Sequence, residues 1–341
     1  MSLRYIAASL GLSVTTVSRA LAGYSDVAEE TRKRIKAEAE RIGYVPNAIA
    51  RRLQKGRTDT IGIVAPTGLD AVADVYLYTA FAAAWTRLAE LDRDLVLLPT
   101  VVGDDGSEIQ SRPFRRAVEE RRVDGLLLLR TLSDDRRLPF LRDAKIPFVV
   151  IGAEHVDRPE VNAIGIDDVA ASDEILARLA GFGHRRVTIV VPEGGFAFAR
   201  SRTDAFAARA SAHSIELRSV PGSFCEEGGR AVTARLLAED QPPTAIVYYA
   251  YRMALGGLRA LSDSVLVAGR HVSVVSFGDN VNLLYSSPPV TAVRAPIDEM
   301  ARHAVDVLIG EIEGRPVEAI RRWPATLVRR QSDGPLVTRP N

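Results

Sequence analysis

Cysteine is nearly absent from this chain of 341 residues, in which Cys225 stands alone. One cysteine cannot form a disulfide within its own chain, so the core must hold the fold, and a reducing compartment such as the cytoplasm is expected. We interpret Cys225 as a small and chemically inert residue.

Long apolar runs are missing as well. The longest candidate, residues 75–86, has about a dozen residues, which suits a buried helix and is too short to span a membrane. The opening residues, MSLRYIAASLGLS, lack the basic flank, apolar run and cleavage site of a secretory signal. We therefore expect a cytoplasmic protein, associated with the nucleoid if it binds DNA, with no membrane partner.

The sequence motifs of common enzymes are also missing. It contains no Gly-rich loop ending in Gly-Lys, no G-x-G-x-x-G after the first strand of the body, no G-x-S-x-G, no H-E-x-x-H and no C-x-x-C. The five histidines lack the spacing of metal ligands. Acidic pairs at 104–105, 134–135 and 167–168 lie in predicted loops, where helix capping or solvation explains them better than acid–base chemistry. We expect no enzymatic activity, no catalytic residues, no metal and no cofactor.

The charge of the chain is divided unevenly. A chain of this length is expected to form two or three units. Residues 1–58 carry 11 basic and 5 acidic residues, a net charge of +6, whereas the remainder has a net charge of −5. A basic head on a mildly acidic body suggests that the head binds a polyanion. A basic, solvated helix is the alternative, and charge alone does not separate the two.

Three short helices are predicted in the head, over residues 3–10, from Ser13 to about residue 21, and over 29–42. Gly11 allows a sharp turn between the first two, and Ser13 is available to cap the second. Ala7, Gly11 and Val17 take the small, turn and buried β-branched positions of a helix-turn-helix.

The second of these helices has a composition suited to a DNA groove. Val14, Thr15 and Thr16 project from its N-terminal end, and Arg19 lies one turn later. Methyl groups of Val and Thr can contact thymine methyls, and an Arg can donate two hydrogen bonds to guanine. An ordinary helical hairpin that uses Ser and Thr as caps is the alternative.

From residue 59 onward, short apolar strands alternate with amphipathic helices. Runs such as TIGIVAP, RDLVLLP, DGLLLLR and IPFVVIG are typical of parallel strands buried on both faces. The alternation predicts βαβ units repeated in two lobes, and a ligand is expected outside the carboxyl ends of the strands.

Several segments, in this order, resemble the LacI/GalR family of bacterial transcriptional regulators: TVSRAL, TRKRI, and GYVPNAIARRLQKGRTDTIGIV. The resemblance extends from Leu3 to about Arg330. It implies a small all-α helix-turn-helix head and an α/β body of two Rossmann-like parallel-sheet lobes, with the topology of a periplasmic binding protein of type I. The implied domains are 1–46 (head), 47–58 (hinge helix and linker), 59–160 plus 290–320 (first lobe), and 161–289 plus 321–335 (second lobe).

The resemblance implies which residues contact DNA. Val14 and Thr15 would be the variable base-reading pair, and Arg19 a less variable base contact. The hinge helix would insert Leu53 into the minor groove at the centre of the operator and kink the duplex. Ser13, Ser18 and Thr31 would contact phosphates, and Asn47, Ala50 and Arg51 would lie in the hinge helix.

This head departs from the family pattern at Ala22, where Asn is common, and at Ala28, where a Ser or Thr usually caps the third helix. Losing such a cap typically costs about 1 kcal/mol.

The resemblance also implies an effector site between the lobes. Arg202 would donate a fork of hydrogen bonds to sugar hydroxyls or to a carboxylate. Phe224 would stack on the ligand, with core packing as its alternative. Asp74 and Tyr76 would supply contacts from the first lobe, and Asp279 an acidic contact from the second.

Two departures from the family pattern fall in this site. Ala250–Tyr251 replaces an Asn-Asp pair, and Gly278 replaces an acidic residue. Tyr251 offers stacking surface instead, so a larger or less polar ligand is expected. A conventional sugar site restored by Asp279, and a cleft that has lost its ligand, stay open.

Together these features predict a sequence-specific DNA-binding regulator, most simply a repressor, that forms a homodimer on pseudo-palindromic double-stranded operator DNA. A small molecule, a sugar or sugar derivative, would control its operator affinity. Effector closing the cleft would rotate the first lobes and separate the hinge helices, with a coupling of about 1–3 kcal/mol. A corepressor-dependent repressor or activator, and a ligand-binding module without a role in gene regulation, are the alternatives.

Overall fold

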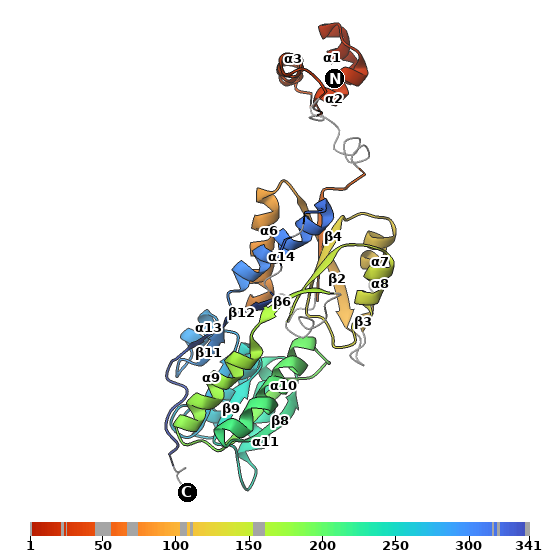
Figure 1. The fold of residues 1–341 in the computed structure, drawn as a ribbon. Helices are drawn as coiled ribbons and strands as arrows, with labels where there is room; N and C mark the ends of the chain where they lie inside the picture. The colour runs from red at the N-terminus through yellow and green to blue at the C-terminus, as the bar shows by residue number, and fades with distance from the viewer. Residues whose placement is uncertain are drawn as a thin grey trace. The chain divides into compact units, whose positions relative to one another are not determined.

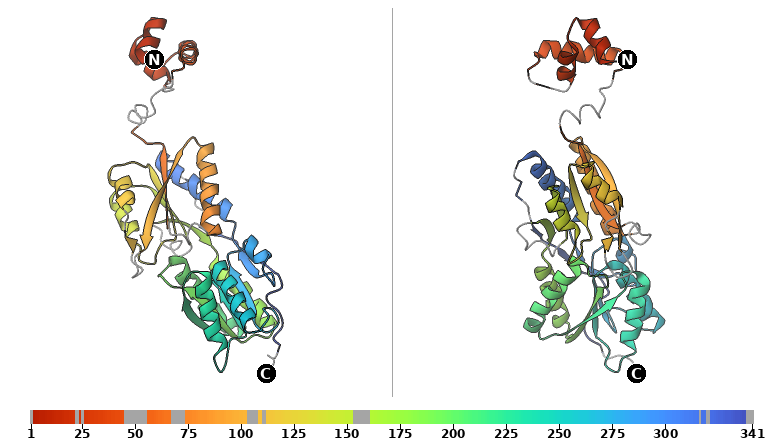
Figure 2. Two further views of the ribbon diagram at one scale, coloured as in Figure 1. Left: turned by 180° about the vertical axis from the view of Figure 1, so that it is seen from behind. Right: turned by 90° about the vertical axis from the view of Figure 1, so that its right-hand side faces the viewer.

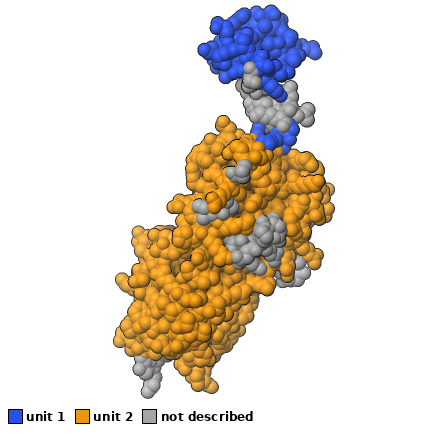
Figure 3. Space-filling model, in the orientation of Figure 1, with its two compact units in different colours: residues 1–59 blue, residues 60–341 orange. Residues whose placement is uncertain are grey.

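The computed structural model describes residues 2–21, 24, 26–44, 56–66, 74–102, 108–109, 112–152, 161–315, 317–318 and 321–337. The chain forms two compact units, Met1–Asp59 and Thr60–Asn341, which Figure 3 colours separately. The expected hinge helix, with the predicted DNA contacts Asn47, Ala50, Arg51 and Leu53, lies outside the described residues, as does Ala22.

The first unit is a three-helix head built from α1 (Leu3–Leu10), α2 (Val14–Leu21) and α3 (Glu29–Arg41). The turn after α1 places Gly11 at φ 68, in the left-handed region where a Cβ is unfavourable. Ala28 precedes α3 without a side-chain cap, as its replacement of Ser or Thr predicts. The predicted helix-turn-helix is confirmed by the core between the helices, which consists of Ile6, Ala7, Val17, Ala20, Val27, Ile35 and Ala39.

The first lobe of the body contains a seven-stranded sheet with the order β12-β6-β5-β4-β1-β2-β3. Neighbouring strands run parallel except for β3, which pairs antiparallel with β2. The strands are β1 (Thr60–Pro66), β2 (Asp94–Val102), β3 (Glu108–Ile109), β4 (Gly125–Leu129), β5 (Phe148–Ile151), β6 (Asn162–Ile166) and β12 (Arg322–Trp323).

The second lobe contains a six-stranded sheet with the order β13-β11-β10-β9-β7-β8. Only β13 is antiparallel to its neighbour. The strands are β7 (Arg186–Pro192), β8 (Glu216–Gly222), β9 (Ala245–Tyr248), β10 (Ser273–Phe277), β11 (Thr291–Arg294) and β13 (Thr326–Val328). The two predicted parallel-sheet lobes are thus present, and their central strands, such as β4, β5 and β9, are unbroken apolar runs because helices cover both faces.

Helices cover both faces of each sheet (Figures 1 and 2). In the first lobe, α6 (Val75–Glu90) packs beside α14 (Ile297–Glu313) on one face, and α7 (Arg112–Glu119) and α8 (Arg137–Asp143) share a core on the other. The second lobe has α9 (Asp168–Gly181), α10 (Ala197–Ala210), α11 (Glu226–Leu237), α12 (Tyr251–Asp263), the short α13 (Val281–Leu284) and one 3-10 turn, Ser211–His213.

The chain crosses between the lobes three times. β6, α14 and β12 belong to the first lobe, whereas α9, β11 and β13 belong to the second. The crossings therefore follow Ile166, Arg294 and Trp323, a few residues later than the expected boundaries before 161, 290 and 321. The difference arises because the strand before each crossing, β6, β11 or β12, pairs with the sheet that the chain is leaving. An apolar pattern does not show which sheet a strand joins.

In the part of the chain that the structure describes, no helix combines the length and apolar character needed to cross a membrane. Nor do three or more His, Cys, Asp or Glu side chains of those residues gather as a metal-binding group. His184 is buried, and its ring nitrogens lie 3.0 Å from Thr244 Oγ1 and 2.9 Å from Ser273 Oγ. Burial lowers the pKa of His184, so the neutral imidazole links the end of α9 to β10 and to the residue before β9.

Helices α11 and α12 approach each other more closely than side chains would allow. A Cβ built on Gly256 would lie 1.8 Å from the carbonyl oxygen of Glu226, and one built on Gly229 would lie 2.1 Å from that of Met253. Both neighbours are backbone atoms, which cannot move aside as a side-chain end can. The glycines are therefore required by the helix contact.

We expect Gly256→Ala to lower the free energy of unfolding of the body by about 1–3 kcal/mol or more, because overpacking forces the two helices apart. Urea unfolding followed by circular dichroism measures this loss. Gly181→Ala is the matched control, since a Cβ at that helical position meets nothing within 4 Å, and it should be neutral or slightly stabilising. Equal effects of the two substitutions would contradict the packing argument.

Candidate functional site

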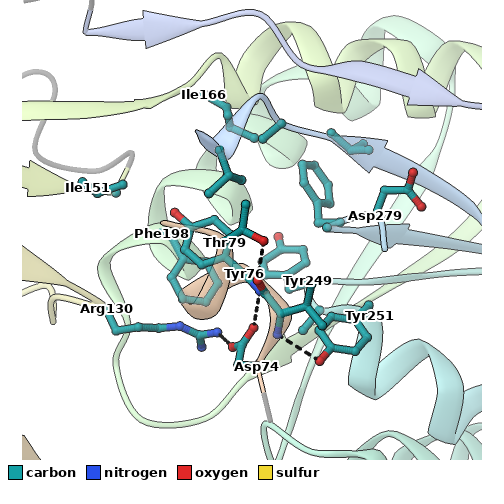
Figure 4. Close-up of a pocket in the computed structure, with 18 of the residues that line it drawn as sticks. Asp74, Tyr76, Thr79, Arg130, Ile151, Ile166, Phe198, Tyr249, Tyr251 and Asp279 are labelled. Carbon is teal, nitrogen blue, oxygen red and sulfur yellow. Dashed lines mark hydrogen bonds and ion pairs between the residues drawn. The ribbon is translucent and has the colours of Figure 1, made fainter. Parts of the chain in front are cut away.

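A cavity of about 220 Å³ lies between the two lobes of the body, at the carboxyl ends of β4, β5, β6, β9 and β10. Figure 4 shows the side chains that line it, which come from both lobes. The structure brings together all the residues predicted to contact the effector: Asp74, Tyr76, Arg202, Phe224, Tyr251 and Asp279. A cleft between the lobes is where an open α/β sheet binds ligands.

Asp74 makes two stabilising contacts at the edge of this cavity. Its carboxylate caps α6 by accepting a hydrogen bond of 2.9 Å from the backbone N–H of Tyr76. The same carboxylate forms an ion pair with Arg130, and both side chains are more than nine-tenths buried. Burial lowers the pKa of Arg130 to about 9, which still leaves the guanidinium charged at neutral pH.

Arg130 was not among the predicted site residues. It follows β4 with φ 57, in the left-handed region that is costly for a residue with a Cβ. The only sequence signal was a basic residue directly after the apolar run GLLLL, and such a residue is usually solvated. In Figure 4 the Arg130 side chain extends to the carboxylate of Asp74, with which it pairs.

Aromatic rings of the second lobe face this first-lobe ion pair. The Arg130 Cζ atom lies 4.2 Å from the ring centre of Phe224 and within 6 Å of the rings of Phe196 and Phe198. The three rings also pack against one another, with centroid distances of 5.5–6.0 Å. Phe224 packs in this aromatic cluster and also lines the cavity, so its predicted stacking on a ligand stays a prediction.

Arg202 lines the cavity from the second lobe, and an acidic residue balances its charge. Its Nε donates a hydrogen bond of 3.0 Å to Asp168, and its Nη1 donates one of 3.4 Å to the carbonyl oxygen of Tyr249. The Cζ atom lies 3.9 Å from the ring centre of Phe277, a short cation–π contact. Arg202 is thus held in place before any ligand arrives.

Three tyrosines add hydroxyl groups to the cleft. Burial raises the pKa of Tyr76 to about 12 and raises the pKa of Tyr249 as well, so both phenols remain neutral donors. The hydroxyl of Tyr251 accepts a hydrogen bond of 3.4 Å from the backbone N–H of Val75, which belongs to the other lobe. Tyr251 therefore makes a contact across the cleft.

The lobes also meet through their backbones beside the cavity. Leu132 and Phe196 form an isolated antiparallel bridge. The N–H of Ala197 donates to the carbonyl oxygen of Thr131 at 3.0 Å, and the N–H of Ser133 donates to that of Gly195 at 3.0 Å. These bonds join the loop after β4 to the loop before α10. A ligand that opens or closes the cleft must act on them.

Asp279 lines the cavity, but its carboxylate is already engaged. Arg294 lies 2.6 Å from one oxygen, and Arg330 lies 2.7 Å from the other. The Asp279 side chain is only 2% exposed, and in Figure 4 it lies apart from the Asp74–Arg130 pair. In this conformation Asp279 anchors two arginines, whose hydrogen bonds all end on Oδ2, while Oδ1 accepts no hydrogen bond from the described residues.

The predicted DNA contacts of the head that the structure describes lie just before α2, within α2 and, for Thr31, in α3. Ser13 caps this helix, since its hydroxyl oxygen accepts a hydrogen bond of 3.0 Å from the N–H of Thr16 and lies 2.8 Å from the Thr16 hydroxyl. Val14, Thr15 and Arg19 are exposed, whereas Thr16, Ser18 and Thr31 are half-buried. The exposed face can therefore contact a DNA groove, while the cap occupies part of the hydrogen-bonding capacity of Thr16.

We expect Asp74→Asn to destabilise the body by about 3–5 kcal/mol, because it leaves Arg130 buried without its counter-ion. Asn still caps a helix well, so the substitution isolates the ion pair from the cap. Thermal or urea unfolding of the full chain measures the loss. Asp298→Asn is the control, because Asp298 borders the same cavity but is exposed, and a change within about 0.5 kcal/mol is expected. An equally small effect at Asp74 would show that the pair is not needed for stability.

Comparison with known proteins agrees with this arrangement. Residues 2–47 match the family model described as bacterial regulatory proteins, lacI family, and residues 176–332 match the periplasmic binding protein-like domain. The HTH-type transcriptional regulator RafR of Escherichia coli is 36% identical over 251 residues, which cover 72% of each chain. AglR of Rhizobium meliloti (strain 1021), another HTH-type transcriptional regulator, is 28% identical over 99% of this chain and 96% of its own.

Solved structures show the same fold. A lac repressor dimer bound to operator and an anti-inducer has a TM-score of 0.82 at 23% identity, over 97% of this chain and 98% of its own. The complex of the transcriptional regulator CelR with cellobiose has a TM-score of 0.71 at 26% identity, over 97% and 99%. With its helix-turn-helix head, its two-lobed body and these relatives, the chain belongs to the LacI family of bacterial transcriptional regulators.

Proposed function

We propose that this LacI-family regulator is a repressor whose binding to a pseudo-palindromic operator is controlled by an uncharged sugar or sugar derivative bound between the lobes. One observation carries the ligand class: the cleft combines aromatic rings with buried charges that are already paired. The proposed DNA binding rests on the exposed face of α2 and on family membership.

The pairing of charges favours a neutral ligand. Among the described residues that line the cavity, Arg130 pairs with Asp74, Arg202 with Asp168, and Arg252 with Glu226. A sugar phosphate would need a cation without a counter-ion, since burying its charge otherwise costs several kcal/mol. An uncharged sugar needs only the remaining donors and acceptors of these pairs for its hydroxyls.

The aromatic rings favour a ligand with apolar faces. Phe198, Phe224, Tyr251 and Tyr76 all border the cavity, and flat rings bury the C–H faces of a sugar while leaving its hydroxyls at the edge for hydrogen bonds. The CelR complex with cellobiose supports a carbohydrate in a fold of this kind. The resemblance implies an Asn-Asp pair where this chain has Ala250–Tyr251. The exchange favours a larger or less polar carbohydrate.

The operator contacts are part of the proposal. Val14, Thr15 and Arg19 would contact base edges, Thr16 would add to this face, and Ser13, Ser18 and Thr31 would contact phosphates. Asn47, Ala50, Arg51 and Leu53 would form the hinge contacts. A two-fold dimer reads a pseudo-palindrome, and the operator-bound lac repressor dimer supports this arrangement. We further propose that the chain acts in the cytoplasm and has no catalytic activity of its own, in keeping with its relatives.

Control would come from linkage between cleft and operator. A ligand changes operator affinity only by the difference in its own affinity for the two states, typically about 1–3 kcal/mol. The inter-lobe bonds from residues 131–133 to residues 195–197 belong to the element that a ligand would shift. A ligand that weakens operator binding is an inducer, whereas a corepressor would strengthen operator binding.

Gel-shift titrations test the proposed DNA binding. They use the full chain and duplexes selected from a random pool. Operator affinity should fall steeply as salt rises, because phosphate contacts release counter-ions. A sugar that binds the body should weaken operator binding about 5- to 150-fold. An affinity that does not change with salt would refute DNA binding through the head, and tighter binding with sugar would identify a corepressor.

Thermal-shift screening of the full chain against neutral sugars and their phosphates tests the ligand class. A neutral sugar at 100 times its dissociation constant should stabilise the protein by about 2.7 kcal/mol, whereas its phosphate should give no shift. Phe224→Ala should reduce the shift, because it removes a stacking surface. Tyr285→Ala, which truncates an aromatic residue that is 81% exposed outside the cavity, should leave the shift unchanged. A larger shift with the sugar phosphates would contradict the argument from paired charges.

A further inference from the structure

Arg19 is held on two sides within the head. Its Nη2 lies 2.6 Å from Oδ2 of Asp26, and its Nε donates to Oδ1 of the same carboxylate at 3.3 Å. Its Cζ atom lies 4.9 Å from the ring centre of Tyr24. Arg19 belongs to α2, whereas Tyr24 and Asp26 lie between α2 and α3. The carboxylate and the ring together restrict one base-reading side chain.

This ion pair is exposed, since the side chains of Arg19 and Asp26 are 47% and 52% accessible. An exposed pair adds little to stability, because water and salt screen it. Its larger effect is on conformation. An arginine side chain loses many rotamers when a bidentate carboxylate and an aromatic ring hold it, so less conformational entropy remains to be lost on binding.

The pair also decides which edge of the guanidinium is presented. Asp26 occupies the Nε–Nη2 edge. A guanidinium has five N–H donors, so those of Nη1 and the second hydrogen of Nη2 remain. Within the described part of the head, Nη1 has no hydrogen-bond partner. Two adjacent donors of this kind match O6 and N7 of guanine in the major groove.

We propose that Asp26 is a positioning residue for base recognition, which holds Arg19 so that its remaining edge meets guanine. The inference rests on the proposed function, because it requires α2 to bind operator DNA. The carboxylate also has a second effect. The negative charge of Asp26 repels DNA phosphates, and this repulsion disfavours binding modes in which Arg19 does not contact a base. Asp26 should therefore raise affinity for the operator and lower affinity for other DNA.

The experiment compares two affinities for each variant of the full-length chain. One probe is a duplex enriched by the wild-type chain from a random pool, together with versions that carry 7-deazaguanine, which lacks the N7 acceptor, at single positions. The other probe is a duplex of random sequence. Asp26→Asn removes the charge with little change in shape. Glu40→Gln is the matched control, because Glu40 is an exposed acid on α3 and is not a partner of Arg19.

We expect Asp26→Asn to weaken binding to the enriched duplex about tenfold, the order of one bidentate base contact, while binding to random DNA stays equal or becomes tighter. The variant should also lose sensitivity to 7-deazaguanine at one position, the same position at which Arg19→Ala loses it. Glu40→Gln should change both affinities by the same factor. Asp26→Glu, which keeps a carboxylate, should recover part of the preference.

A merely structural role of Asp26 would lower both affinities together and would overturn the proposal. An effect of Asp26→Asn that persists in an Arg19→Ala background would also overturn it, because Asp26 would then act without Arg19. Tighter binding to the enriched duplex would mean that Asp26 masks Arg19 instead. A wild-type chain that enriches no sequence would refute the proposed function itself, before any variant is compared.

Discussion

A buried charge must meet a partner of opposite sign, and this requirement organises the centre of the body. Asp74 and Arg130 satisfy it for each other at the point where α6 begins and β4 ends. The pair needs Arg130 in an unfavourable backbone conformation, which the structure retains because the alternative is an unpaired ion in the interior. The loop after β4, the start of α6 and the aromatic cluster of the second lobe are all positioned around this pair.

The same requirement shapes the rest of the cleft. Arg202 reaches Asp168 from another helix, and Asp279 is shared between Arg294 and Arg330. With these charges paired inside the protein, what remains for a ligand is hydrogen-bonding capacity and ring surface. This supports the proposal of a polar but uncharged ligand. It also links ligand binding to lobe geometry, because rings from one lobe cover an ion pair from the other.

In the head, charge pairing occurs at an exposed site and has a different consequence. Solvent reduces the stability gained from Arg19 and Asp26, but the geometry of the contact remains. The body thus uses ion pairs to bury charge, whereas the head uses one to orient a side chain that faces outward.

Local patterns were sufficient to predict the three helices of the head and the main buried strands of the body. Turn and cap residues such as Gly11 and Ser13 act within a few residues of their own position, and apolar runs such as GLLLL predict buried parallel strands wherever the sheet lies. The helix-turn-helix and the two α/β lobes were therefore accessible from the sequence. The family resemblance added six predicted effector contacts, and the structure places all six around one cavity.

Only the tertiary structure decided how distant residues pair. Asp74 and Arg130 are 56 positions apart, and Arg330 reaches Asp279 across 51. No local pattern specifies such partners, because they depend on which strands are neighbours and on where each chain crossing falls. For this reason the sequence suggested Asp279 as a ligand contact and did not point to Arg130. In the folded chain, Asp279 lines the cavity while paired with two arginines, and Arg130 lines it as the partner of Asp74.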